Sequence, residues 1–238
     1  MPPFTLPPGY PRIRRVHSFE ELVTTRFGDG VNALCWARTL PGDFGEVVEL
    51  LGEGGGEGIV TLDDARLESL PVTAAGRVAI GILLEDQRRL REHDLDPVLN
   101  CIHGYPCDED PGPVVTDVFS FHTDRAPVET DTWLCTYHGL ASEGLRNDEA
   151  LRRVDFPATR AALLHEFGGT DDDEFLAFLS DHSYDLHYAP HPQAQPFSFG
   201  PGHLWRIAVD YPGSPVPPCI HRAPATHPGD PPRLLLIS

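Results

Sequence analysis

The sequence predicts a mainly β protein with flanking α-helices, built around a double-sheet jelly-roll core. Two observations lead to this prediction. After residue 95, short apolar segments alternate with turns that contain Pro and Gly, as in a sandwich or barrel. Before residue 96, helix caps and an apolar stripe at helical spacing predominate. We therefore expect a single domain over 1–238, with N-terminal helical support in 1–95 and a jelly-roll core in 96–238.

Three helices are expected in the N-terminal part. The segment "SFEELVTTR" (18–26) begins with a serine cap and has a glutamate three residues later, and "GDFGEVVELLG" (42–52) closes on a glycine. The longest helix should cover about 73–94, where an apolar stripe can pack against a sheet. The glycine-rich segment 52–58 is predicted to be a loop, because it lacks the lysine and the following helix of a phosphate-binding loop.

Strand-like segments follow the long helix. They cover 97–105, 114–124, 131–139, 184–190, 203–211, 217–224 and 233–238. Two helices interrupt them over about 146–182. The first has Pro157 near its first turn and Gly168 past its end, and the second should be capped by Thr170. We expect this helical pair to be an insertion between strands of the core.

The charge of the chain limits its partners and its chemistry. There are 36 acidic and 18 basic residues, which gives a formal charge of -18 and disfavours nucleic acids and anionic membranes as partners. The sequence contains no lysine, which excludes a Schiff base with pyridoxal phosphate and a Walker-type phosphate lysine. The expected partner is a small molecule, and any anionic group on it must bind to arginine.

The cysteines and the start of the sequence indicate a reducing compartment. The 5 cysteines are an odd number without the spacing of a disulfide framework, and the sequence opens without an apolar signal segment. No apolar run approaches the roughly 20 residues that a membrane-spanning helix needs. We therefore expect a cytoplasmic protein.

The segment "VVTDVFSFHTD" (114–124) contains His122 and Asp124, two residues apart. On a strand this spacing places both side chains on one face, where an imidazole and a carboxylate suit a divalent metal ion. A third ligand, His221, follows about 100 residues later in the strand-like "PPCIHRAP" (217–224). Without that third ligand, a strand histidine and an aspartate that opens a turn would be the simpler interpretation.

The order of these residues, with Arg233 about a dozen residues after His221, resembles the iron(II)/2-oxoglutarate-dependent dioxygenase superfamily. The resemblance covers roughly 95–238 and implies a double-stranded β-helix, the cupin-like form of the jelly roll. It implies that His122, Asp124 and His221 are the catalytic ligands of iron(II), and that Arg233 binds the far carboxylate of 2-oxoglutarate, which is consumed with dioxygen. The implied enzyme hydroxylates or otherwise oxidises a small polar metabolite, an amino acid or a natural-product intermediate.

The sequence departs from the superfamily pattern next to Arg233. That arginine is often followed two residues later by Ser or Thr, whereas this sequence has Leu235. Arg222 is a second candidate for binding the cosubstrate. It ranks lower because it follows His221 directly, and neighbouring residues on a strand face opposite ways. The segments "FHTD" and "WLCTYHG" also resemble the clavaminate-synthase-like and taurine-dioxygenase-like branches, and the subfamily stays open.

Two other functions use the same three ligands. A cupin-type metalloenzyme would hold the metal without 2-oxoglutarate, and Arg233 would then be a structural residue. A non-catalytic metal-binding jelly roll is the other alternative, because a fold alone does not determine a function.

Several other side chains could form sites of their own. A zinc knuckle of Cys101, His103 and Cys107 lacks the second pair of ligands that a closed zinc site needs. Trp205 and Arg206 are candidates for the lining of a substrate pocket, with a core position as the alternative for Trp205. Surface or packing positions are expected for three further histidines, His182, His187 and His191.

Overall fold

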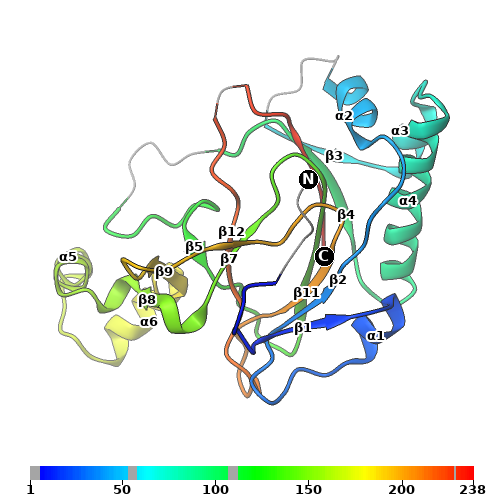
Figure 1. The fold of residues 1–238 in the computed structure, drawn as a ribbon. Coiled ribbons are helices and arrows are strands. Elements are labelled where there is room, and N and C mark those ends of the chain that lie inside the picture. The colour runs from blue at the N-terminus through cyan, green and yellow to red at the C-terminus, as the bar shows by residue number, and fades with distance from the viewer. Residues whose placement is uncertain (1–5, 53–57, 107–111, 228) are drawn as a thin grey trace.

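The computed structural model describes residues 6–52, 58–106, 112–227 and 229–238. The described chain forms two curled β-sheets with helices on their outer sides (Figure 1). The larger sheet has the strand order β1-β2-β11-β6-β13-β4-β3, and the smaller sheet has the order β10-β7-β12-β5-β9-β8. Among the described strands only β1 and β2 pair in parallel, and the other pairs are antiparallel.

The strands are short apart from one in the middle of the larger sheet. That sheet consists of β1 (Ile13–Val16), β2 (Ala33–Trp36), β3 (Ile59–Leu62), β4 (Val98–Ile102), β6 (Asp131–His138), β11 (Leu204–Ala208) and β13 (Arg233–Ile237). The smaller sheet consists of β5 (Phe121–His122), β7 (Glu143–Leu145), β8 (Ala150–Arg152), β9 (His187–Pro190), β10 (Phe197–Ser198) and β12 (Ile220–Arg222).

The helices fall into two groups along the chain. The N-terminal group is α1 (Phe19–Thr24), α2 (Phe44–Gly52), α3 (Asp64–Ser69) and α4 (Ala74–Arg91). The second group lies between β7 and β9 and consists of η1 (Asn147–Glu149), η2 (Arg153–Asp155), α5 (Pro157–Phe167), α6 (Asp173–Asp181) and η3 (Tyr184–Leu186). No helix in the described part of the chain is long and apolar enough to span a membrane.

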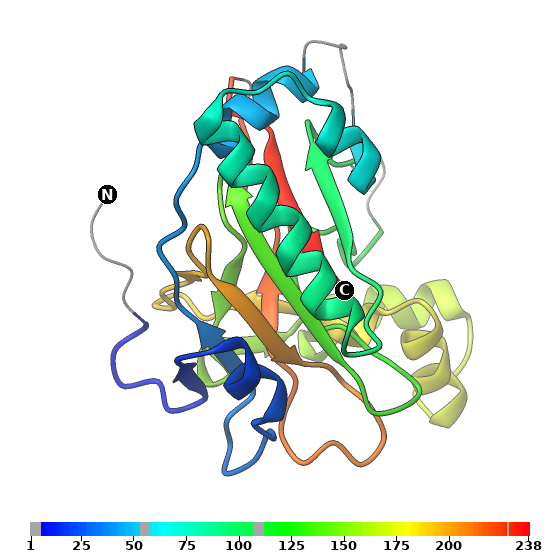
Figure 2. The ribbon, with the colours of Figure 1, turned by 90° about the vertical axis from the view of Figure 1, so that its right-hand side faces the viewer.

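The helix α4 lies across the outer face of the larger sheet, as Figure 2 shows. Its first turn is capped by the Thr73 side chain, and buried residues recur along the face that meets the sheet, including Ile80, Leu83 and Leu90. They pack in one core with Trp133 and other residues of β6. The predicted long helix, and its position against a sheet, are confirmed.

A second core lies between the two sheets. The residues of β6 alternate, so that Trp133 faces the helices while Leu134 packs with Trp205 and Leu235. Cys219, which directly precedes β12 of the smaller sheet, contributes to this same core. The space between the sheets is therefore closed by apolar side chains, and polar residues that point into it need partners there.

The N-terminal part differs from the expectation of helical support in 1–95. It also supplies β1, β2 and β3 to the larger sheet, and α3 is an additional helix. These strands have four residues each. Runs this short do not extend over enough residues to distinguish a strand from a buried helical turn by periodicity.

The expected strand 114–124 is wrong over most of its length. Only Phe121–His122 is a strand, and residues 112–120 form turns and irregular structure. The Asp117 carboxylate explains the turn, because its Oδ1 accepts hydrogen bonds from the backbone N–H groups of Phe119 and Ser120 at 2.9 and 3.0 Å.

The helical insertion between strands is confirmed in part. The helix α5 starts at Pro157 and ends at Phe167, and it is capped by Gly168, whose φ of 73° is in the left-handed region. The cap of α6 is Asp172 rather than Thr170, because the Asp172 carboxylate reaches the free N–H groups of the first turn and the Thr170 hydroxyl instead donates to that carboxylate. Residues of α5, α6 and η2 form a small hydrophobic core together with Val114. The predicted glycine-rich loop lies largely outside the described residues.

Candidate metal centre

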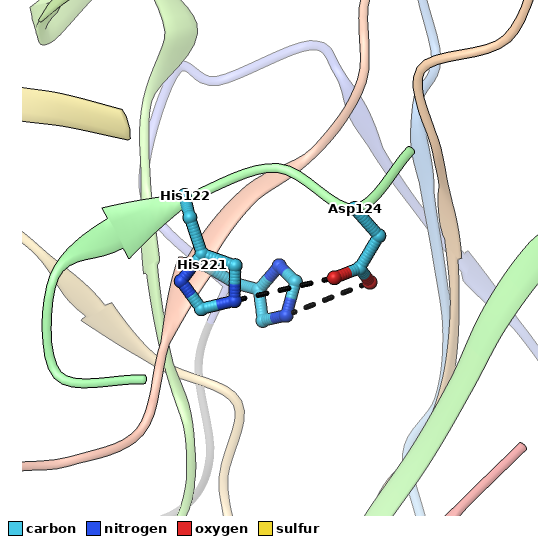
Figure 3. Close-up of side chains that lie close together, drawn as sticks. All are labelled: His122, Asp124 and His221. Carbon is cyan, nitrogen blue, oxygen red and sulfur yellow. Dashed lines mark ion pairs between the residues drawn. The ribbon is translucent and has the colours of Figure 1, made fainter. Parts of the chain in front are cut away.

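The candidate centre lies where β5 and β12 pair. His122 and His221 stand directly opposite each other in this antiparallel pair, with ring centroids 4.7 Å apart. Asp124 lies in the loop after β5, and its carboxylate turns back toward both rings (Figure 3). The three predicted ligands therefore converge. They do so through a sheet pair and a loop rather than through alternation along a single strand.

The ligand atoms are close enough together to share one metal ion. The Nε2 atom of His122 is 4.0 Å from Oδ1 of Asp124, and Nε2 of His221 is 3.8 Å from Oδ2. All three ligand atoms lie within 4.8 Å of one another. Ligands about 2.1 Å from a metal ion lie about 3 Å apart when they are neighbours in its coordination sphere. Side-chain rotations that shorten the gaps by about 1 to 2 Å would complete the site.

Both imidazoles are oriented by backbone carbonyl groups. The Nδ1 atom of His122 lies 2.7 Å from the carbonyl oxygen of Ser120, and Nδ1 of His221 lies 3.5 Å from that of Cys219. A proton on each Nδ1 satisfies these carbonyls and leaves the Nε2 lone pairs directed at Asp124. Burial lowers the pKa of His221 from its ordinary value, which favours the neutral imidazole that metals bind.

The carboxylate of Asp124 is held from the opposite sheet. The Thr132 hydroxyl, on β6, donates a hydrogen bond to Oδ2 of Asp124. The backbone N–H of Asp210 donates to the Asp124 carbonyl at 2.8 Å. Asp124 thus bridges the space between the sheets. Its triad with the two histidines is the one group of three or more potential metal ligands that converges within the described residues.

A cavity of about 450 Å³ opens beside the triad. Its walls come from the turn at 116–118, the segment 122–125 and the end of the helical insertion at 183–187. The cavity is large enough for a small metabolite, and two of the three ligands, His122 and Asp124, contribute to its lining. A molecule bound in it would lie next to a metal ion held by the triad.

His187 adds a third imidazole to the same row of the smaller sheet. It stands opposite His122 in the β5–β9 pair, with ring centroids 5.7 Å apart, and it lines the cavity. The residue is 5 % exposed, and burial lowers its pKa to about 4. The burial of His187 agrees with a packing position. Its place beside the candidate metal centre was not predicted. His182 and His191 are exposed, as expected.

Arg233, the first residue of β13, is buried with 2 % exposure. Its guanidinium donates to the carbonyl of Leu140 at 2.7 Å and to the hydroxyls of Tyr105, Ser142 and Thr136 at 2.5, 3.1 and 3.4 Å. Every one of these acceptors is formally neutral, and no carboxylate among the described residues pairs with it. Arg233 is thus a buried cation without an anionic partner in the described part of the chain.

Arg233 and the triad share the space between the sheets. Thr132, which binds Asp124, and Thr136, which binds Arg233, lie on the same face of β6, separated by about 13 Å along the strand. Three hydroxyls surround Arg233, and Leu235 packs in the core between the sheets. They come from three separate segments, so spacing around Arg233 in the sequence could not identify them.

No model of a protein family, no curated protein and no solved structure matches this chain. The function must be inferred from the site itself.

Arg222 has a different environment from that of Arg233. Its guanidinium pairs with the Glu143 carboxylate at 2.7 Å and lies over the Phe121 ring, 4.2 Å from the ring centroid. Phe121 belongs to the apolar cluster on the other side of the smaller sheet from His221. Strand alternation therefore directs Arg222 away from the triad, and its charge is already paired.

The remaining candidate residues do not reach the centre. Trp205 is a core residue, stacked on Phe199, and its indole N–H donates to the Phe199 carbonyl at 2.7 Å. Arg206 pairs with Asp131 at 2.6 Å and does not line the cavity at the triad. In the disfavoured zinc knuckle, Cys101 Sγ and His103 Nε2 are 3.6 Å apart, and Cys107 lies outside the described residues.

Proposed function

We propose that this protein is an iron(II)- and 2-oxoglutarate-dependent oxygenase that oxidises a small polar metabolite, an amino acid or a natural-product intermediate. The observation that carries the proposal is Arg233, a buried cation that faces the same inter-sheet space as the His122, Asp124 and His221 triad. A metal site alone does not require such a cation. A dicarboxylate that binds the metal at one end and a guanidinium at the other requires both.

The order of the strands supports the finer fold assignment to a double-stranded β-helix. The neighbours β4-β13-β6-β11 in the larger sheet and β5-β12-β7-β10 in the smaller sheet form two four-stranded layers. Successive strands of the chain mostly alternate between these layers, as expected for a jelly roll of eight strands. In this assignment β1, β2 and β3 extend the larger layer, and β8 and β9 frame the helical insertion.

The chemistry of the ligand set suits iron(II). Two imidazoles and one carboxylate on one side of the ion leave further positions for the two chelating oxygens of the keto acid and for dioxygen. Bound iron would supply the redox centre at which dioxygen oxidises 2-oxoglutarate and then the substrate. The Nδ1–H groups of His122 and His221 and the Thr132 hydroxyl keep the three ligands oriented for that ion.

Arg233 would bind the distal carboxylate of 2-oxoglutarate. Its guanidinium is held in place by the Leu140 carbonyl and the surrounding hydroxyls, so little conformational freedom is lost on binding. The Tyr105 and Ser142 hydroxyls can rotate their protons toward the incoming carboxylate and add hydrogen bonds to it. The primary substrate would bind in the cavity lined by Asp124 and His187.

The alternative is a cupin-type metal protein without a keto acid, either an enzyme or a non-catalytic metal binder. One observation favours it: Arg233 already donates to four acceptors in the absence of any anion. A wholly structural arginine would have the same environment. The two proposals share the metal site and differ in what Arg233 binds.

Titration of 2-oxoglutarate into the anaerobic iron(II)-loaded protein separates the proposals. We expect a visible charge-transfer band that saturates with one equivalent of keto acid, and succinate formation after oxygen is admitted. Iron binding without the band and without succinate would favour the cupin-type protein. The expected cytoplasmic location stays a prediction, supported by the four described cysteines, which are free thiols.

A further inference from the structure

Arg125 directly follows the ligand Asp124 and makes a set of bonds that metal binding alone does not explain. Its guanidinium forms a two-pronged pair with Asp185, at 3.2 and 2.6 Å, and donates to Ser180 Oγ at 2.8 Å. It also donates to Asp210 at 2.8 Å. Arg125 therefore uses all three of its nitrogens, and its partners come from two distant segments.

The partners on one side anchor the backbone around the ligand. Asp210 follows β11, and its N–H donates to the Asp124 carbonyl at 2.8 Å. The carbonyl of Asp210 accepts from the N–H of Ala126 at 2.9 Å. Asp210 therefore binds the backbone on both sides of Arg125 as well as the Arg125 side chain.

The partners on the other side belong to the helical insertion. Ser180 lies in the last turn of α6 and Asp185 lies in η3. The helices of the insertion pack mainly in their own core, together with Val114 and Val154. The side chain of Arg125 is therefore a direct polar link between that separately packed body and the segment that carries Asp124.

We infer that Arg125 is a positioning residue that couples the helical insertion to the metal site. It holds the 124–126 segment so that the Asp124 carboxylate faces the two imidazoles, and the insertion supplies the fixed point. The inference rests on the proposed metal site and is independent of 2-oxoglutarate. Because coupling between two sites is reciprocal, metal binding should in turn stabilise the attachment of the insertion.

The expected effect is on metal affinity rather than on the fold. The Arg125 side chain is 32 % exposed, and partly exposed ion pairs contribute little to global stability. Residues that orient a metal ligand from outside the coordination sphere matter more for the metal, since their removal typically weakens binding about 10- to 100-fold.

The chain offers a matched control. Arg160 in α5 also forms a two-pronged pair, with Asp171 and through its Nε and Nη2 atoms, and its side chain is 30 % exposed. It belongs to the same insertion but makes no bond to the 124–126 segment. Arg125→Leu and Arg160→Leu each remove a two-pronged ion pair of the insertion at similar exposure. Arg125→Leu also removes the pair with Asp210, which binds the backbone next to Asp124.

Manganese(II) and cobalt(II) binding by the full chain is the first measurement. We expect Arg125→Leu to raise the Kd at least about tenfold and Arg160→Leu to leave it unchanged. Arg125→Lys should recover part of the affinity, because it keeps the charge but loses the two-pronged pairing. Should Arg125→Leu fail to fold, Asp185→Asn replaces it, since it removes the charge of the partner and keeps its shape.

Amide hydrogen exchange across α6 is the second measurement. Metal should slow exchange there in the wild type and in Arg160→Leu, and should have no such effect in Arg125→Leu. If the wild type binds no metal, the proposed centre and function are overturned. If the wild type binds metal and Arg125→Leu binds it equally well with the same protection of α6, only the coupling is overturned.

Discussion

His122 and His221 face each other on adjacent antiparallel strands although about 100 residues separate them in the sequence. The backbone ladder between β5 and β12 fixes the two imidazoles relative to each other. The carboxylate of Asp124, in contrast, is positioned by a loop and by its contacts with Thr132 and Asp210. The site thus combines two rigid ligands with one that depends on its neighbours, and the predictions below test each part.

Asp124→Ala should abolish tight metal binding and leave the fold intact. The carboxylate is the one anionic ligand of the triad, and a ligand cluster contributes little to stability without its metal. Isothermal titration with cobalt(II) and the far-ultraviolet circular dichroism spectrum measure the two effects. Asp171→Ala, which removes a surface carboxylate of the insertion, is the control and should bind metal normally. Loss of the folded spectrum in Asp124→Ala would favour a structural role for this residue.

Arg233→Leu should weaken 2-oxoglutarate binding about a hundredfold and leave iron binding unchanged. The variant leaves the distal carboxylate unpaired in a buried site, which costs about 2 to 5 kcal/mol. Arg222→Leu should have a much smaller effect, because Arg222 pairs with Glu143 on the opposite face. Anaerobic titration of the charge-transfer band gives the 2-oxoglutarate affinities of the two variants. If Arg222→Leu weakened 2-oxoglutarate binding more than Arg233→Leu does, Arg222 would be the residue that binds the cosubstrate. If neither variant changed the binding, the cupin-type metal protein would replace the proposed oxygenase.

Thr132→Val and Thr136→Val should separate the two ends of the inter-sheet site. Thr132 donates to Asp124, so its loss should weaken metal binding by about tenfold or more. Thr136 accepts from Arg233, so its loss should act on the keto acid and spare the metal. Each variant is assayed for both ligands. If both variants lost affinity for the metal and for 2-oxoglutarate to the same extent, the site would not have two separate ends.

The free energy of unfolding of the metal-free protein should fall as the pH drops from about 6.5 toward 4. Burial lowers the pKa of His203 to about 4, whereas an unfolded histidine titrates near 6.5. Between these values the unfolded chain binds the proton and the folded chain does not, so His203 alone should cost about 2 kcal/mol at pH 5. Urea unfolding at pH 7.5 and pH 5 measures the loss.

The control for this pH dependence is His203→Asn. Its side-chain oxygen can still accept the hydrogen bond that Arg38 N–H donates to Nδ1 of His203 at 3.0 Å, but it does not titrate. The difference in unfolding free energy between the two pH values should therefore shrink by about 2 kcal/mol in this variant. An unchanged difference would assign the acid sensitivity to other groups.

Long periodic elements could be predicted from the sequence, and short paired strands could not. The helix α4 has 18 residues with a cap and a repeated apolar stripe, so local information was sufficient to predict it. The strand β2 has four residues, and its partners β1 and β11 come from both sides of it in the chain. Its conformation is determined by pairing with distant segments rather than by its own pattern.

The candidate site shows the same division. The three candidate metal ligands occur in a specific order, so they could be predicted to converge, and their ligand atoms lie within 4.8 Å. The reason given for His122 and Asp124, alternation on one strand, was wrong because the strand ends at His122. Ser142 and Tyr105 were missed because single hydroxyl residues are too common for their spacing to indicate that they surround Arg233.

The position of β12 between β5 and β7 also determines when during folding the metal site can exist. His221 follows His122 by about 100 residues, and β12 must insert between two strands that precede it in the sequence before its ring can face His122. Pairing between segments so distant in sequence is among the slow steps of folding. A partly folded or nascent chain therefore presents at most His122 and Asp124, too few ligands to retain the ion. Under the proposed function, the ion would bind after the smaller sheet is complete and would stabilise the fold once formed.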